Sequence, residues 1–479
     1  MSSETICAPA TASGGAIAII RISGASALDA VDSVVSFRHG DASSAGGFVV
    51  KFGVVPELDE VLVSIFRAPH SYTGEDMAEI SCHASPFIVS GVLERLCAAG
   101  CRLARAGEFT QRAFVAGKMD LSQAEAVADL IASDSAASHK LAYSQLRGAY
   151  SQKLRDLRSQ IVELSALLEL ELDFSEEEVE FADRARLKAL ASETQAECQR
   201  LADSFRLGNA FKQGIPVAIV GAVNSGKSTL LNALLGEDRA IVSDIPGTTR
   251  DTVEEVLTLN GVKYRFIDTA GLRETEETIE RMGIERSFAQ IGQAAVVIAL
   301  LDGTADAEAL LPVVAAVKAH LREDSRVIWV RSKADLCSFS SIISPSTKNG
   351  LFVDGSGAKQ GPVHEFKDFC GRLGIPEAIE LSAKTGQGLD ELRQAISAAD
   401  VDSLKASRAV LVTNQRHYDA LRRAAADLGR VLDGLESGSP TDLVAEDLRS
   451  ASSALGEIVG EILPDDILGT IFSRFCIGK

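Results

Sequence analysis

Residues 221–229 read Gly-Ala-Val-Asn-Ser-Gly-Lys-Ser-Thr, and the organisation of the whole chain can be worked out from this stretch. It matches the pattern GxxxxGK(S/T) of a phosphate-binding loop, in which glycines let backbone N–H groups surround phosphate oxygens. An apolar segment at 216–220 precedes it and predicts a buried parallel strand, and residues 228–235 have a helical pattern that Gly236 closes. A strand, a glycine loop and the positive end of a helix together predict a triphosphate site.

Two side chains of this loop have separate expected roles. Lys227 is expected to reach the β- and γ-phosphates, and the Ser228 hydroxyl is expected to bind Mg²⁺. An ordinary glycine turn is the competing interpretation, and the strand and helix patterns on either side of the loop argue against it.

Length and composition limit the class of protein. A chain of 479 residues predicts about three domains. No apolar run approaches the ~18 residues that a membrane span needs, so we expect no membrane partner. The first residues lack the basic segment and apolar core of a signal peptide, which predicts a cytoplasmic protein with reduced cysteines.

The charge balance limits how the chain can contact nucleic acid. Its formal net charge is −19. A large nucleic-acid footprint depends on clustered Lys and Arg that neutralise phosphates. We therefore expect any contact with RNA to use a local patch or a more basic companion protein.

Composition changes along the chain and predicts three kinds of domain. Residues 1–118 alternate short strand patterns with breaks at Gly, Pro and Ser, which is typical of an α+β domain. No proline occurs between Pro86 and Pro216, and apolar residues spaced by three and four from 154 to 168 predict long packed helices. Helical patterns resume after about residue 388.

We therefore expect an α/β P-loop nucleotide domain inserted into an all-α helical domain and preceded by an α+β domain. Two independent helical domains are the alternative, and each would be thin. The expected bounds are 1–118 for the α+β domain, 119–212 and 396–479 for the two parts of the helical domain, and 213–395 for the nucleotide domain.

Four later segments follow the phosphate loop in the order and at roughly the spacing of a GTPase, which predicts that 213–395 is an α/β P-loop, Ras-like GTPase domain. They are Gly247-Thr-Thr-Arg-Asp251, Tyr264-Arg-Phe-Ile-Asp-Thr-Ala-Gly271, Val327-Ile-Trp-Val-Arg-Ser-Lys-Ala-Asp335 and Ile379-Glu-Leu-Ser-Ala-Lys384. A threonine of the first can complete the Mg²⁺ shell, Asp268 can hold Mg²⁺ through water, and the Gly271 N–H can sense the γ-phosphate.

The third segment predicts the base. The Asp335 carboxylate can accept from the N1–H and the exocyclic amine of guanine, whereas adenine would leave it unpaired, so GTP is favoured over ATP. The residues expected to contact GTP are Asn224, Ser225, Gly226, Lys227, Ser228, Thr229, Ser243, Asp244, Ile245, Pro246, Gly247, Thr248, Thr249, Asp268, Thr269, Ala270, Gly271, Ser332, Lys333, Asp335, Ser382, Ala383 and Lys384.

The chain departs from the usual GTPase pattern at two positions. Ser332 stands where the pattern NKxD has asparagine, which predicts weaker guanine affinity because serine is shorter and lacks the amide. Leu272 follows the DTAG segment where many GTPases carry the glutamine that orients the attacking water. The Ser/Gly-rich residues 338–361 are expected to form a flexible surface insertion.

Other groups must then assist catalysis. Asn224 and the segment 243–248 could coordinate a monovalent cation beside the phosphates, at the place where an arginine finger would otherwise put positive charge. Glu280 is the candidate catalytic residue that orients the water. The alternative for Glu280 is a solvated charge among the acidic residues 274–277.

At this point the chain resembles the MnmE (TrmE) family of tRNA-modification GTPases over nearly its whole length. The GTPase motifs are shared with other families, whereas three further stretches are specific. They are Ser71-Tyr-Thr-Gly-Glu-Asp76, the pair Ala106-Gly-Glu-Phe-Thr-Gln-Arg-Ala-Phe114 and Lys118-Met-Asp-Leu-Ser-Gln-Ala-Glu-Ala126, and the terminal Phe475-Cys-Ile-Gly-Lys479.

The resemblance implies a homodimer held by N-terminal domains that bind 5-formyltetrahydrofolate or a related tetrahydrofolate. The matching folate-binding positions are Arg21, Glu79, Lys118 and Lys479. A pterin offers an amide-like edge to a carboxylate, and its glutamyl tail suits cations. Cys476 lies near that pocket in the family, and the resemblance leaves open whether it is catalytic or a buried structural thiol.

The resemblance also implies the ions and the partner. Asn224, Ser243, Ile245 and Thr248 match K⁺ ligands, Ser228 and Thr249 match Mg²⁺ ligands, and Glu280 matches the residue that orients water. K⁺-dependent contact of two G domains would switch on hydrolysis. With an FAD-dependent MnmG (GidA) partner in a heterotetramer, the family adds aminomethyl or carboxymethylaminomethyl to carbon 5 of the wobble uridine, using a tetrahydrofolate one-carbon unit.

A partner of that kind could carry much of the tRNA contact, which agrees with the acidic composition. The rival function is an Era- or Der-like GTPase switch that docks on RNA during ribosome assembly. The terminal 475–479 stretch, the folate-site residues and the lack of a basic KH-like tail favour the first function.

Overall fold

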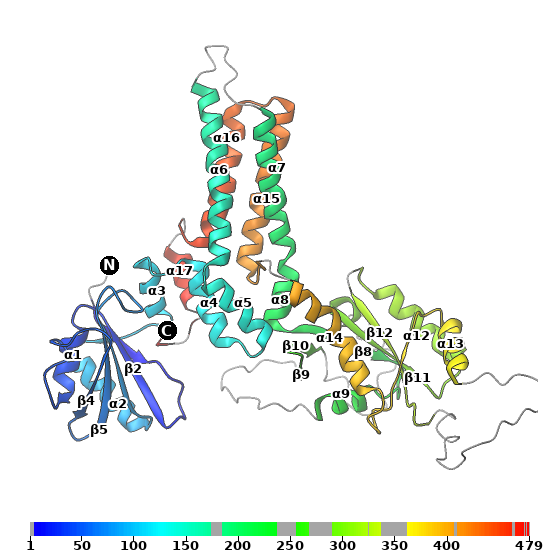
Figure 1. Cartoon of the computed structure of the whole chain (residues 1–479), viewed down its shortest axis with the longest axis horizontal. Coiled ribbons are helices and arrows are strands. Elements are labelled where there is room, and N and C mark those ends of the chain that lie inside the picture. The colour runs from blue at the N-terminus through cyan, green and yellow to red at the C-terminus, as the bar shows by residue number, and fades with distance from the viewer. Residues whose placement is uncertain are drawn as a thin grey trace, which may run out of the picture. The chain divides into compact units, whose positions relative to one another are not determined.

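The computed structural model describes residues 4–173, 184–236, 255–267, 290–323, 325–336, 362–406, 410–461, 465–473, 475 and 477–478 (Figure 1). The chain forms two compact units. Unit 1 contains residues up to 132, 142–204 and 414 onward, and unit 2 contains 133–141 and 205–413. The chain therefore enters and leaves unit 2 twice.

The N-terminal part of unit 1 is a seven-stranded sheet in the order β3-β4-β5-β6-β2-β1-β7. Two helices, α1 (Ala27–Val34) and α2 (Pro86–Ala98), bury their apolar residues in one core with the inward side chains of the sheet. Val61, Val63 and Ile65 alternate with more exposed neighbours, so one face of the sheet is covered. The strands are β1 (Ile6–Pro9), β2 (Ile17–Ser23), β3 (Ser36–Phe37), β4 (Val49–Val55), β5 (Asp59–Phe66), β6 (Met77–His83) and β7 (Arg102–Leu103).

The rest of unit 1 is helical. Helices α6 (Ala149–Asp173), α7 (Arg184–Asp203), α15 (Gln415–Ser437) and α16 (Thr441–Val459) lie side by side (Figure 1). The predicted apolar stripe from 154 to 168 is buried, which confirms the packed helix there. Two short helices follow the sheet, α3 (Glu108–Val115) and α4 (Leu121–Ala132), and a third lies near the end of the chain, α17 (Asp465–Phe472). Helix α5 (Ala136–Leu146) begins in unit 2 and ends in unit 1.

Unit 2 contains a six-stranded sheet in the order β13-β12-β11-β8-β10-β9, with all neighbours parallel except β10 and β9. Alternate side chains of β8 face two separate cores, so Val217 and Ile219 lie on one face and Ala218 and Val220 on the other. The strands are β8 (Ile215–Gly221), β9 (Glu255–Leu259), β10 (Val262–Phe266), β11 (Val296–Asp302), β12 (Arg326–Ser332) and β13 (Ile379–Glu380).

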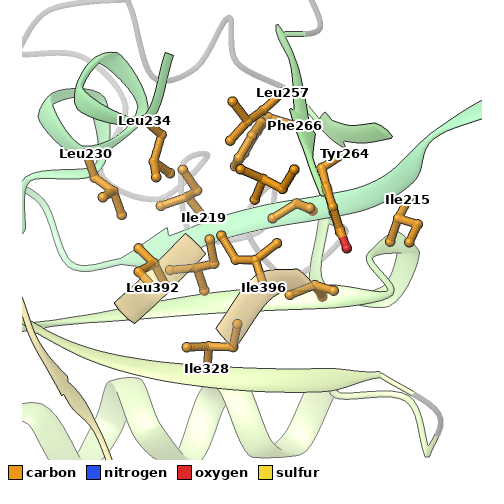
Figure 2. Packing of buried hydrophobic residues seen from close by; sticks show 14 of the residues in the cluster. Ile215, Ile219, Leu230, Leu234, Leu257, Tyr264, Phe266, Ile328, Leu392 and Ile396 are labelled. Carbon is orange, nitrogen blue, oxygen red and sulfur yellow. The ribbon is translucent and has the colours of Figure 1, made fainter. Parts of the chain in front are cut away.

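Helices cover both faces of this sheet. On the first face, α9 (Lys227–Gly236) contributes Leu230 and Leu234, and α14 (Leu389–Ala406) contributes Leu392 and Ile396, as Figure 2 shows. On the second face, α12 (Ala307–His320) and α13 (Pro362–Leu373) pack around the buried Trp329. The predicted α/β P-loop domain is confirmed, and so is its insertion between two helical parts.

The boundaries of unit 2 differ from the expected 213 and 395. Helix α8 (Phe205–Gln213) belongs to unit 2 because its Phe211 is buried in the same core as β8. Gly208 lies against the chain at 411–412, where an added Cβ would meet the Val412 carbonyl oxygen at 2.1 Å. Leu411 enters the same core, so the boundary falls after residue 413.

The N-terminal sheet and the helical part also form one unit by contact. Leu121 and Ala124 of α4 pack with Phe472 and Phe475 near the chain end. An added Cβ at Gly107 would meet the carbonyl oxygen of Phe472 at 2.6 Å, so this approach requires glycine. No helix within the described ranges is long and apolar enough to cross a membrane.

Candidate functional site

The phosphate loop connects the end of β8 to the start of α9. Asn224 and Gly226 have φ angles of +59° and +96°, the left-handed conformation that glycine and asparagine tolerate best. An added Cβ at Gly221 would meet the Leu300 carbonyl oxygen and the Ser225 Oγ, each at 2.7 Å. Backbone geometry therefore requires the glycines of the motif. Because α9 begins directly after the loop, the N–H groups of its first turn are available to a phosphate bound there.

The Lys227 side chain is hydrogen-bonded to the backbone of this loop. Its Nζ donates to the carbonyl oxygens of Gly221 at 2.9 Å and Ala222 at 2.8 Å. Burial lowers the pKa of the Lys227 ammonium from its ordinary value. The positive charge is thus placed at the N-terminus of α9, where it adds to the helix dipole in favouring a phosphate. Ser228 and Thr229 lie in the first turn of the same helix.

The residues predicted to recognise the base meet at the ends of β12 and β13. The Ser382 Oγ donates to Asp335 Oδ1 at 2.7 Å, and the Ala334 N–H donates to the Leu381 carbonyl oxygen at 3.1 Å. Ser382 is buried, and its Oγ also accepts from the Thr385 N–H at 3.3 Å. The Ser382 hydroxyl therefore holds one oxygen of the Asp335 carboxylate in place. Ala383 and Lys384 follow Ser382 in the same turn.

Lys333 takes a strained backbone conformation beside these residues. Its φ is +57°, and its Nζ lies 2.6 Å from Asp302 Oδ2. Burial opposes ionisation of Asp302, but the Lys333 and Thr304 hydrogen bonds outweigh it and lower the pKa of the carboxyl group. Ser332, one residue earlier, is buried and donates to the Ser225 carbonyl oxygen at 2.8 Å. The end of β12, where the base contacts are predicted, is therefore in direct contact with the phosphate loop.

Much of the predicted GTP site falls outside the described residues, and so do two predicted residues near the C-terminus. These are Ser243, Asp244, Ile245, Pro246, Gly247, Thr248, Thr249, Asp268, Thr269, Ala270, Gly271, Glu280, Cys476 and Lys479. The segment 338–361 lies outside them too. Within the described ranges, no group of three or more His, Cys, Asp or Glu is placed to hold a metal ion.

A second cluster lies on the N-terminal sheet of unit 1. Arg21 donates through Nε to Glu79 Oε1 at 2.9 Å, and its Nη2 lies 2.8 Å from the same oxygen. Its Nη1 donates to the Gly478 carbonyl oxygen at 3.1 Å. The Tyr72 and Phe109 rings lie 5.4 and 5.7 Å from the guanidinium carbon. Two of the predicted folate residues thus meet each other and the C-terminal segment.

Lys118 is held separately in unit 1. Its Nζ donates to the Pro69 carbonyl oxygen, and its side chain lies against Gly74. These contacts place it beside the loop that follows β5. In the described parts of the chain, Lys118 forms no hydrogen bond with Arg21 or Glu79.

Sequence reasoning missed a buried ionic cluster in the helical part of unit 1. Glu125 on α4 contacts His417 Nε2 at 2.7 Å and Arg416 Nη2 at 3.0 Å, both in the first turn of α15. Arg416 Nη1 also donates to the Glu457 carbonyl oxygen at 2.6 Å. Tyr150 of α6 stacks on His417 with ring centroids 5.3 Å apart. Burial alone would raise the pKa of Glu125, but His417 and Arg416 outweigh it and lower that pKa to about 2.

The signal for this cluster was present in two separate stretches. Glu125 lies in the family-specific stretch 118–126, and Arg416 and His417 lie in an amphipathic segment almost 300 residues later. Nothing in one sequence indicates that the two stretches meet. The same holds for the contact between Ser332 and Ser225, which are 107 positions apart.

Comparisons with known proteins agree over the whole chain. The family described as "MnmE helical domain" matches residues 121–476, and "GTP-binding protein TrmE N-terminus" matches residues 5–118. The protein named tRNA modification GTPase MnmE from Bacteroides fragilis is 47% identical over 485 residues and covers 100% of both chains. Its namesake from Bacteroides thetaiotaomicron is 46% identical over 488 residues, with the same coverage.

Among solved structures, the G domain of the T. maritima FeoB iron transporter is 24% identical. It covers 40% of this chain and 98% of its own, with a TM-score of 0.25. The full-length matches to MnmE proteins do not support the Era- or Der-like alternative. On the family matches and the full-length identities, this chain belongs to the MnmE (TrmE) family of tRNA modification GTPases.

Proposed function

We propose that this chain is a K⁺-activated GTPase whose cycle drives modification of carbon 5 of the wobble uridine in certain tRNAs. The product is aminomethyl- or carboxymethylaminomethyl-uridine, made with a tetrahydrofolate one-carbon unit and an FAD-dependent partner of the MnmG (GidA) type. The observation that carries the nucleotide part is the contact between the phosphate loop and the strand that presents Asp335.

Different residues of the described structure would bind the phosphates, the base and the metal ion. Lys227 and the N-terminus of α9 favour the phosphates, and Asp335 accepts from the guanine edge while Ser382 fixes its orientation. Ser228 lies in the first turn of this helix and would supply one Mg²⁺ ligand. Thr249 and Asp268 would complete that metal site, and Mg²⁺ would neutralise charge on the β- and γ-phosphates.

K⁺ would take the place of an arginine finger. The proposed ligands are Asn224, Ser243, Ile245 through its carbonyl, and Thr248. Asn224 lies in the phosphate loop directly before Ser225 and has a left-handed backbone. One of the four proposed K⁺ ligands thus lies within the loop that would hold the phosphates. Glu280 would orient the attacking water. The test is the rate of GTP hydrolysis in KCl and in NaCl; we expect a steep loss in NaCl, and equal rates would refute the cation.

A tetrahydrofolate would bind at the N-terminal sheet. Support comes from the Arg21–Glu79 pair, which offers a carboxylate for a pterin edge and lies against the carbonyl of Gly478 and two aromatic rings. Lys118 and Lys479 would supply charge for the glutamyl tail. Calorimetry with 5-formyltetrahydrofolate tests this assignment: we expect Glu79→Gln to weaken binding at least about tenfold, and unchanged affinity would remove Glu79 from the site.

A homodimer would use the face of the same sheet that lies opposite α1 and α2. Across β4, β5, β6 and β2, the residues Phe52, Leu62, Ser81 and Ile19 stand in one row. Leu62 is 50% exposed although its neighbours Val61 and Val63 are buried on the other face. Apolar side chains on an open sheet face favour burial against a second copy. The MnmG-type partner and tRNA would join that dimer as a heterotetramer, the partner carrying much of the RNA contact.

A further inference from the structure

One hydroxyl group joins the base-recognition strand to the phosphate loop. Ser332 ends β12 and is 3% exposed, and its Oγ donates to the Ser225 carbonyl oxygen at 2.8 Å. The same Oγ lies 3.3 Å from the Leu301 carbonyl oxygen in β11. A single buried hydroxyl therefore links the ends of two strands to the loop.

This bond uses the donor capacity of the side chain. A serine hydroxyl has one hydrogen to donate, whereas an asparagine amide has two and an additional acceptor oxygen. The Ser332 hydrogen is directed to backbone carbonyls of Ser225 and Leu301. It is therefore committed to the loop rather than to a nucleotide base.

The bond also fixes a backbone direction in the loop. The Ser225 carbonyl and the Gly226 N–H belong to the same trans peptide plane and point in opposite directions. With the carbonyl held by Ser332 in the interior, the Gly226 N–H points away from it. Gly226 has a φ of +96° and directly precedes Lys227, so this N–H belongs to the part of the loop that surrounds a phosphate.

Base recognition has its own support a short distance away. Asp335 receives a hydrogen bond from the Ser382 Oγ at 2.7 Å, and Ser382 lies after β13 rather than in the phosphate loop. Two serines thus support two different parts of the nucleotide site, and no hydrogen bond in the described ranges links one serine hydroxyl to the other.

We propose that Ser332 is a positioning residue for the phosphate loop, which orients the Ser225–Gly226 peptide for phosphate binding and leaves the guanine base to Asp335. The inference rests on the proposed GTP site. It predicts that changes at Ser332 affect every ligand that carries phosphates equally, whether or not the ligand has a base.

The test uses the full chain with Mg²⁺ and three ligands: GTP, ITP and inorganic tripolyphosphate. Each displaces a fluorescent GTP analogue. We expect Ser332→Ala and Ser332→Cys to weaken all three by one common factor of about 3- to 10-fold, the loss of one hydrogen bond. Ser332→Asn, whose amide can donate to Ser225, should restore tripolyphosphate binding to within about twofold of wild type.

Ser325→Ala is the matched control. Ser325 directly precedes β12, at the end of the strand away from Ser332, and its Oγ donates to the Ala294 carbonyl oxygen at 2.7 Å. The Ser325→Ala variant therefore loses the same kind of hydrogen bond, but far from the phosphate loop. It should leave all three affinities within about twofold of wild type. Ser382→Ala gives the contrast: the preference for GTP over ITP should fall, and tripolyphosphate binding should stay unchanged.

Folding is checked through the fluorescence of Trp329, the single tryptophan, which is buried in β12. Ser332→Cys keeps nearly the serine volume while donating only weakly, so it remains informative if the alanine variant unfolds. The inference is overturned if the folded Ser332 variants lose GTP but keep tripolyphosphate binding, or if they match Ser325→Ala. A wild-type chain that binds none of the ligands would instead overturn the proposed GTP site.

Discussion

Individual residues in this chain derive their properties from partners far away in the sequence. The base-recognising role predicted for Asp335 comes from its own segment, because a carboxylate after a strand and before SAK is typical of a guanine site. The partner of Ser332 did not follow, since a hydroxyl at the end of a strand can reach several backbone carbonyls. The Glu125 cluster was equally hidden, because charge on an amphipathic helix normally indicates a solvated face.

Glu125→Gln tests the buried ionic cluster of unit 1. Removing one partner of a buried pair leaves the other charge uncompensated, so we expect unfolding free energy to fall by about 3–5 kcal/mol at pH 7. The pKa of Glu125 is lowered to about 2, below the ordinary 4.5, so its contribution is present above pH 4.5 and is lost as pH falls toward about 2. Urea denaturation followed by circular dichroism at several pH values measures this.

The difference between wild type and Glu125→Gln should therefore shrink steadily below pH 4.5. Glu163→Gln is the control, because its pair with Arg186 is exposed and should contribute less than about 1 kcal/mol. A difference between wild type and Glu125→Gln that stays constant from pH 7 to pH 3 would contradict the ionic account.

Asp335→Asn tests base recognition. The amide would place a donor against the donors of guanine, and it would suit the carbonyl that xanthine carries at the same position. We expect GTP affinity to fall at least about 100-fold and XTP affinity to rise, as measured by displacement of a fluorescent analogue. Asp390→Asn, an exposed carboxylate at the start of α14, should change neither affinity.

Among elements, hydrophobic periodicity predicted the interiors better than the ends. The buried stripe from 154 to 168 and the strand before the phosphate loop were both confirmed, because each buries one set of side chains at a regular spacing. The ends of unit 2 were displaced, because α8 has a helical pattern of its own and only its docking on β8 assigns it to the nucleotide unit. Such docking is a tertiary property that helical spacing does not encode.

Gly208→Ala tests that docking. A Cβ at this position would lie 2.1 Å from the Val412 carbonyl oxygen, and backbone cannot move aside as a flexible side chain can. We expect unit 2 to lose about 2 kcal/mol or more, measured by thermal unfolding through Trp329 fluorescence. Gly371→Ala is the matched control in α13: nothing lies within 4 Å, and alanine is the better helix former by about 1 kcal/mol.

The two glycine variants should thus change stability in opposite directions. If Gly208→Ala is as stable as Gly371→Ala, the approach of α8 to residues 411–412 is not the contact that attaches this helix to unit 2. A Gly208→Ala variant that unfolds earlier but keeps its affinity for GTP at low temperature would agree with a purely structural role.

For the whole molecule, the acidic composition limits how RNA and protein partners can be recognised. A chain with a net charge of −19 cannot attract RNA through its overall field, so specific surfaces must bring partners together. The proposed MnmG-type partner would carry the contact with RNA, and the side of the N-terminal sheet that carries the half-exposed Leu62 is the proposed surface for a second copy. That face contains polar pairs such as Arg21 and Glu79 beside the apolar row, so assembly and folate binding would share one sheet.

Leu62→Glu tests the proposed dimer surface. Leu62 lies on β5, in the middle of the sheet, and is 50% exposed. A carboxylate there would be desolvated by the second copy, and two related carboxylates would face each other across a symmetric interface. We expect the dimer to dissociate at least about 100-fold more readily, measured by sedimentation velocity over a range of concentrations. Leu443→Glu, on α16 and 59% exposed, is the control and should sediment as wild type. If Leu62→Glu remains dimeric at the lowest concentration, the dimer interface lies on another surface of the chain.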